Sequence, residues 1–222
     1  MHSDTRNTPL SRLRGALELI AQPFAWSATA PAALHSVLRR ALRAYGRAGP
    51  AAARASLDTG RWSLELLKHL EWRRFEDLCG AYFATQHDAG QAAILVHCKA
   101  WDAHRVGIKP ARALRAAMSA AGAADGVLVT SGQFTRETTD YAAKEGLRLI
   151  DGAALLGRLA ALPPEQSQAL LSLATQGDYL TPSCPCCSIK MTARRSTAEG
   201  RTFWGCPNYP RCKEILFGAG VG

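Results

Sequence analysis

The chain has 222 residues, a formal net charge of +9 and a sequence pI of about 9.5. This length suffices for one good core and a small accessory module. The basic balance favours a polyanionic partner, with nucleic acid ahead of an acidic membrane surface. The seven cysteines are odd in number, and five of them crowd near the C-terminus, which argues against a secreted disulfide framework and indicates a reducing cytoplasm.

A membrane partner is not expected. The stretch "GALELIAQPFAWSATAPAAL" is the one candidate for a spanning helix, but it contains Glu18, two prolines and several polar residues. The N-terminus is polar and shows no compact apolar core followed by a cleavage site, so no signal peptide is expected.

Residues 1–60 form a basic leader rich in Ala and Arg. Apolar residues recur at helical spacing between Leu34 and Tyr45, and arginines such as Arg39 and Arg43 line the other side. Two interpretations stay open: a solvated or partly disordered helical leader, or a helix that contacts DNA phosphates. "GRAGPAAARAS" is typical of a linker.

Residues 62–176 alternate helix and strand patterns. The segment "EWRRFEDLCGAYFA" places a wide apolar stripe at helical spacing, and "AAILVHCK" follows as a strand. Helices are then predicted at 109–122, 135–146, 153–162 and 165–177, and strands at 126–132 and 147–152. Thr135 is the expected cap of one helix, and Gly122 and Gly146 are expected helix ends. This alternation predicts an α/β domain with helices packed on a mixed sheet.

Residues 180–217 carry a cysteine module. Cys184 and Cys187 form one C-x2-C knuckle, and Cys206 and Cys212 form a C-x5-C knuckle after a hairpin-length segment. Four thiolates on two turns suit tetrahedral Zn²⁺, which would supply folding energy to a module with few apolar groups. Cys186 sits inside the first knuckle and is expected to point away from the metal.

The stretch "FWGCPNYPRC" resembles the C-terminal zinc ribbon of bacterial type I topoisomerases. That resemblance implies a DNA-binding module that prefers single strands. Aromatic residues would stack on bases and basic residues would meet phosphates, unless the aromatics pack around the knuckles instead. The candidate contacts are Lys190, Arg194, Arg195, Arg201, Phe203, Trp204, Tyr209, Arg211 and Lys213.

The central segment resembles the Mrr family of type IV restriction endonucleases, in the PD-(D/E)xK superfamily. The matching pieces are "WRRFEDLCGAYF", "VHCKAWDAHRVGIKPARAL", "GVLVTSGQFT" and "LRLIDG". The resemblance implies a restriction-endonuclease-like fold that cleaves modified DNA with Mg²⁺, held by carboxylates, and a lysine that stabilises charge. By position, Glu76 matches the helical glutamate and Lys99 matches the lysine.

The sequence departs from that family at two points. His97 stands where Gln or Glu is usual, and an imidazole is a poor Mg²⁺ ligand compared with an oxygen donor. The strand that normally bears the catalytic aspartate is replaced by "ATQHDAGQAA", in which Asp88 is the sole acid. Two functions therefore stay open: an active endonuclease, or a degenerate nuclease fold that binds DNA through its zinc ribbon. The oligomeric state is left open as well, with a homo-oligomer as one alternative.

Overall fold

The computed structural model describes residues 57–86, 94–99, 105–196 and 202–217. The first helices are α4 (Leu64–His69) and α5 (Trp72–Gln86), and the predicted helix between Leu34 and Tyr45 lies outside the described residues. The elements that follow are β1 (Ile94–Lys99), β2 (Arg105–Val106), α6 (Ile108–Ala121), β3 (Asp125–Thr130), β4 (Gln133–Phe134), α7 (Arg136–Glu145), β5 (Arg148–Ile150), α8 (Gly152–Ala160), α9 (Pro164–Thr175), β6 (Thr192–Arg195), β7 (Thr202–Gly205) and β8 (Ile215–Leu216).

The central sheet has the strand order β1-β3-β5. Within the described ranges all pairing in this sheet is parallel, with Val96 opposite Val127 and Lys99 opposite Thr130. A second, two-stranded parallel pair joins β2 to β4. Antiparallel pairing is found in the C-terminal module, where β7 lies between β6 and β8. The predicted α/β class is confirmed, although a mixed central sheet was expected and its described strands are all parallel.

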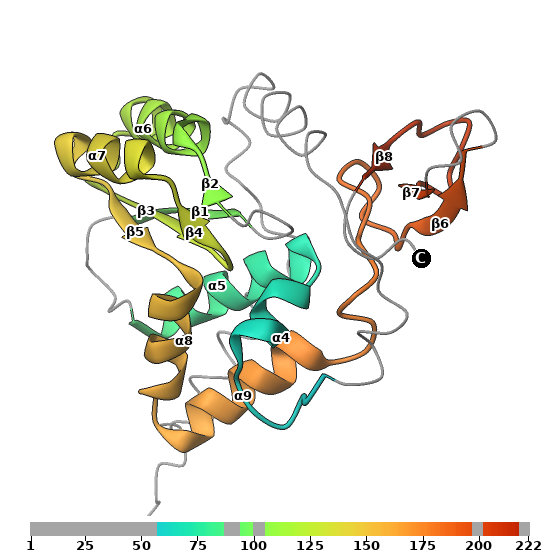
Figure 1. The fold of residues 1–222 in the computed structure, drawn as a ribbon, viewed down its shortest axis with the longest axis horizontal. Helices are drawn as coiled ribbons and strands as arrows, with labels where there is room; N and C mark the ends of the chain where they lie inside the picture. The colour runs from blue at the N-terminus through green and yellow to red at the C-terminus, as the bar shows by residue number, and fades with distance from the viewer. Residues whose placement is uncertain (1–56, 87–93, 100–104, 197–201, 218–222) are drawn as a thin grey trace, which may run out of the picture.

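Helices cover both faces of this sheet, with α6 and α7 on one face and α5 and α8 on the other (Figure 1). The side chains of β3 contribute to both helix layers, because successive residues of a strand point to opposite faces of the sheet. Val127 and Val129 pack with α4, α5, α8 and α9, whereas Leu128 packs with α6 and α7. The first of these cores is the larger and includes the fully buried Phe75 of α5.

Local signals in the sequence set most helix boundaries correctly. Thr135 caps α7, because its hydroxyl accepts a hydrogen bond from the backbone N–H of Thr138 at 3.3 Å. Gly122 and Gly146 end α6 and α7 with φ angles of 63° and 67°, a left-handed conformation that favours glycine. None of the helices in the described ranges is long and apolar enough to cross a membrane.

The cysteine module is a three-stranded antiparallel sheet with two loops that carry the cysteines (Figure 1). Its buried residues form a small core of their own, made of Cys184, Met191, Trp204, Cys206, Cys212 and Leu216. The predicted limits of the three sequence segments, 1–60, 62–176 and 180–217, stay predictions.

Candidate functional site

The two cysteine knuckles are closed by backbone hydrogen bonds. In the first knuckle, the N–H of Cys184 donates to the carbonyl of Ile189 at 2.8 Å, and the N–H of Ser188 donates to the carbonyl of Cys184 at 2.8 Å. In the second, the N–H of Cys206 donates to the carbonyl of Glu214 at 3.1 Å, and the N–H of Cys212 donates to the carbonyl of Asn208 at 3.0 Å. These turns fix where each sulfur points.

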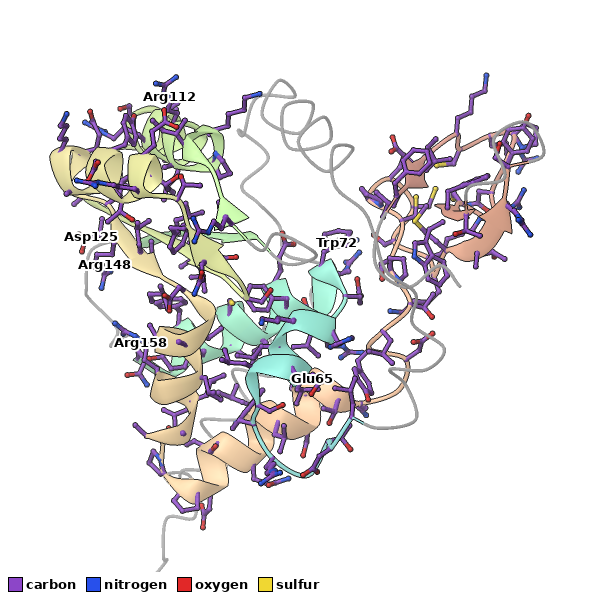
Figure 2. All side chains as sticks on the ribbon, viewed as in Figure 1. Glu65, Trp72, Arg112, Asp125, Arg148 and Arg158 are labelled. Carbon is purple, nitrogen blue, oxygen red and sulfur yellow. The ribbon has the colours of Figure 1, made fainter. Side chains whose placement is uncertain are left out.

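The four cysteines predicted to bind the metal lie close together. The Sγ atoms of Cys184, Cys187, Cys206 and Cys212 all lie within 4.8 Å of one another, and those of Cys184 and Cys212 are 3.7 Å apart. Four thiolates at about 2.3 Å from a tetrahedral ion would stand roughly 3.8 Å from one another, so the spacing suits such an ion. The yellow sulfur atoms can be seen together inside the module in Figure 2.

Burial favours the protonated form of two of these thiols, those of Cys184 and Cys206. It raises the pKa of Cys184, and it raises the pKa of Cys206 to about 12. For Cys212 burial acts in the same direction, but the backbone of Glu214 and the neighbouring thiols outweigh it and lower the pKa. A divalent cation among the four sulfurs would favour the thiolate form, because ligand and metal charges attract. Metal binding by this group therefore releases protons.

Cys186 is exposed and is not a member of the four-sulfur group. Its absence from the cluster agrees with the prediction that it points away from the metal.

The three aromatic candidates for base stacking differ in exposure. Trp204 is only 7% exposed and belongs to the core of the module, so it cannot present its face to a base without unfolding. Phe203 is half-buried, with its ring centroid 6.2 Å from that of Phe217. Tyr209 is 64% exposed. Neighbours on a strand point to opposite faces, so the sequence could have shown that Phe203 and Trp204 would not both be exposed.

The basic residues predicted to contact DNA phosphates also differ in their surroundings. Arg194, Arg195, Arg211 and Lys213 are exposed, and Arg201 lies outside the described residues. Lys190 contacts protein rather than solvent alone, because its Nζ lies 3.2 Å from Oε1 of Glu71 and 2.8 Å from the carbonyl oxygen of Thr181. Lys190 thus has partners within the protein, and its contact with DNA stays a prediction.

The structure describes some of the candidate catalytic residues and leaves Asp88 outside its described ranges. Glu76 is exposed on α5. His97 and Lys99 lie on β1, where their backbones pair with Leu128 and Thr130 of β3. Lys99 is thus at the carboxyl end of a parallel strand, which is where α/β sheets usually place their functional groups.

Sequence reasoning missed two acidic residues near the start of α5. Glu71 is almost fully buried and contacts the cysteine module. Asp77 is half-buried, and burial raises its pKa against the opposing effect of Arg73 and Arg74. A helical pattern with Glu and Asp beside apolar positions was the available signal, but it does not reveal a partner more than a hundred residues away.

The described residues thus hold a parallel α/β layer with a lysine at a strand end and, after it, a module in which four cysteines could hold a metal ion. Residues 82–159 match the Mrr_cat family model, which is described as a restriction endonuclease. This part of the chain is therefore similar to restriction endonucleases, and the match includes Lys99 but begins after Glu76. The matched segment ends before the cysteine module. A comparison with curated proteins found no match.

Proposed function

We propose that this protein binds DNA and that its cysteine module, holding one Zn²⁺, makes much of the contact. The observation that supports this most directly is the meeting of four cysteine sulfurs within 4.8 Å, beneath a surface that carries several basic side chains. The exposed basic residues are Arg194, Arg195, Arg211 and Lys213, and Tyr209 lies between the second pair of cysteines in sequence. Basic groups with an exposed aromatic ring are the usual surface for single-stranded nucleic acid.

Zinc fits the module better than an oxygen-seeking ion. All four donors are sulfur, and Zn²⁺ accepts four thiolates in a tetrahedral structural site. The apolar core beside the cysteines is small, with Met191, Trp204 and Leu216 as its buried members. A domain of this size gains most of its folding energy from the metal. A reducing cytoplasm would keep the thiols available.

The Mrr_cat match supports a second part of the proposal, that the α/β domain hydrolyses DNA phosphodiesters, including those of modified DNA. Mg²⁺, when bound, would supply Lewis-acid polarisation of the scissile phosphate. Lys99 would stabilise charge on the phosphate oxygens and orient the attacking water. Glu76, Asp88 and, less favourably, His97 are the candidates for holding the ion.

A specific observation favours the alternative, a nuclease fold that has lost cleavage and retains DNA binding. Among the residues that the structure describes, the four cysteines are the one group of three or more His, Cys, Asp or Glu side chains close enough to share an ion. The expected aspartate strand is replaced by a short segment whose sole acid is Asp88, and His97 replaces the usual oxygen donor. These two departures from the family pattern favour a domain that binds DNA without cleaving it.

One paired experiment separates these functions. Purified protein is incubated with methylated and unmethylated supercoiled plasmid in Mg²⁺ or Mn²⁺, and binding to labelled single- and double-stranded oligonucleotides is measured by fluorescence anisotropy. Nicks that disappear with Lys99→Ala, but persist with Lys144→Ala on the exposed face of α7, would support the nuclease. Salt-sensitive binding without nicks would support the degenerate fold. A protein that neither binds nor nicks DNA would contradict the proposal of DNA binding.

A further inference from the structure

Glu71 lies directly before α5 and carries a carboxylate that is only 3% exposed. Its Oε1 accepts hydrogen bonds from the Nζ of Lys190 at 3.2 Å and from the hydroxyl of Ser183 at 3.0 Å. Its Oε2 accepts from the backbone N–H groups of Arg73 at 3.0 Å and Ser183 at 3.3 Å. Three of these four donors come from residues 112 and 119 positions further along the chain. The start of α5 is thus bound by a segment of the cysteine module.

The two residues that hold Glu71 also close the first cysteine knuckle. Ser183 and Lys190 face each other as an isolated antiparallel bridge. Between them the N–H of Cys184 donates to the carbonyl of Ile189 at 2.8 Å, and Cys187 lies on the same loop. The loop between Ser183 and Lys190 carries two of the four sulfurs. Its shape sets the distance between these two residues, and therefore whether both can donate hydrogen bonds to the carboxylate of Glu71.

Trp72, the first residue of α5, makes a second contact with the same loop. Its indole N–H donates to the carbonyl of Ser183 at 2.8 Å. Its ring packs against the core of the cysteine module, which includes Cys184, Met191 and Trp204. Figure 2 labels Trp72 at the end of α5 that faces the module. Polar and apolar contacts therefore join the same turn of α5 to the same knuckle.

We propose that Glu71 couples metal binding in the cysteine module to the stability of the first turns of α5, the helix that carries Glu76. This rests on the proposed zinc site. When metal holds the knuckle, Ser183 and Lys190 satisfy the buried carboxylate. When metal leaves, the loop is no longer cross-linked and those donors separate. A buried carboxylate without partners is strongly destabilising, so the first turns of α5 open to water.

Hydrogen exchange on the full-length protein tests this coupling directly. Zinc content is first measured by metal analysis, and amide exchange is then followed by mass spectrometry with Zn²⁺ bound and after chelation. Peptides covering 71–79 report on α5, and peptides covering 136–145 in α7 serve as the internal control. We expect chelation to accelerate amide exchange at 71–79 by about tenfold or more, because local opening exposes these amides to water. Exchange at 136–145 should stay unchanged.

Variants distinguish coupling from general loosening. Lys190→Met removes the charged partner and keeps the apolar stem, so exchange at 71–79 is expected to be fast with zinc bound and to respond little to chelation. Lys213→Met, an exposed lysine of the same module that makes no contact with Glu71, is the matched control and should behave as wild type. Glu71→Gln combined with Lys190→Met removes the unpaired charge and should restore part of the protection.

Each outcome has a distinct meaning. A protein that binds no zinc overturns both the zinc site and the coupling. Zinc that binds but whose removal changes exchange in 180–217 alone leaves the metal site standing and overturns the coupling. A Lys190→Met protein whose 71–79 segment stays as protected as that of Lys213→Met would show that the Glu71 contact does not hold α5.

Discussion

The sulfur atoms of Cys184 and Cys212 lie 3.7 Å apart, although 28 residues separate them in the sequence. Cys187 and Cys206 complete the group, so each knuckle contributes two sulfurs. This arrangement links the two ends of a module whose apolar core is too small to close it unaided. If the proposed Zn²⁺ is bound, it should contribute more to the stability of the module than side-chain packing does.

Replacing Cys212 with Ser should release the metal and unfold residues 180–217. A structural Zn²⁺ site contributes on the order of 10–16 kcal/mol at neutral pH, and a site with three thiolates loses much of this. The checks are zinc stoichiometry and near-ultraviolet circular dichroism, which reports on the packing of Trp204. Cys186→Ser is the matched control and should keep one Zn²⁺ per chain. Full loss of zinc from Cys186→Ser would mean that the wrong cysteine was assigned to the first knuckle.

Tyr209→Ala should weaken binding to single-stranded DNA while leaving the module folded. Its ring is 64% exposed, and stacking of one base on an aromatic ring contributes about 1–3 kcal/mol. Tyr209→Phe keeps the ring and should bind nearly as well as wild type. Ile215→Ala removes another exposed apolar side chain of the module and should have little effect. Equal binding by Tyr209→Ala and wild type, measured by anisotropy, would exclude stacking at this position.

The same reasoning predicts a different defect for Trp204. Because the side chain is only 7% exposed, Trp204→Ala should destabilise the module by about 3–5 kcal/mol, as other large-to-small core changes do. Its DNA affinity should fall only through unfolding. Zinc retention and thermal melting of the variant distinguish this from a lost contact, since a variant that melts like wild type and binds weakly would place Trp204 on the binding surface after all.

Features set by neighbouring residues could be predicted from the sequence. Thr135 and Gly146 mark the two ends of α7 because capping depends on a few adjacent positions. The four ligands could be assigned because metal-binding knuckles have narrow spacing rules. The packing of helices on the sheet follows from the alternation of helix and strand, whereas the sequence predicts a mixed sheet and the described strands of the central sheet are all parallel.

Features set by distant residues could not be predicted. The contact of Glu71 with Ser183 spans 112 positions, and no local pattern indicates that a carboxylate before a helix will be buried by another module. The salt bridge of Lys190 could not be predicted either, because Glu71 lies 119 positions away in the sequence. The burial of Trp204 depends on which side of β7 faces the knuckles, which sequence alternation alone leaves undecided.

Two carboxylates should respond to pH with opposite sign. Burial raises the pKa of Asp77, so the folded protein holds that proton more tightly than the unfolded chain. Its contribution to stability is present below pH 3.8 and is lost as the pH rises through the higher folded value. Burial would also raise the pKa of Asp178, but hydrogen bonds from Thr181 and Leu180 outweigh it and lower the pKa. Its contribution is present above pH 3.8 and is lost as the pH falls through the lower folded value.

Urea unfolding of Asp77→Asn and Asp178→Asn between pH 3 and pH 7 measures both effects. Relative to wild type, Asp77→Asn should gain stability as the pH rises, whereas Asp178→Asn should lose it. Both variants keep an oxygen acceptor at the same position, so differences reflect charge. Curves that shift in the same direction would contradict the assigned environments of the two groups.

The decisive prediction for the nuclease domain concerns Lys99, whose backbone pairs with Thr130 at the carboxyl end of β1. If the domain cleaves DNA, Lys99→Ala and Glu76→Ala should each abolish Mg²⁺-dependent nicking, because loss of charge stabilisation at such a position costs roughly a hundredfold or more in rate. Lys144→Ala should leave nicking unchanged. Asp88→Asn then decides whether the shortened segment supplies the missing metal ligand. Nicking that survives Asp88→Asn would assign the second carboxylate elsewhere. If wild-type protein leaves plasmid intact in both Mg²⁺ and Mn²⁺ while binding it, the domain acts as a DNA-binding fold, and Lys99→Ala should then affect affinity and its salt dependence alone.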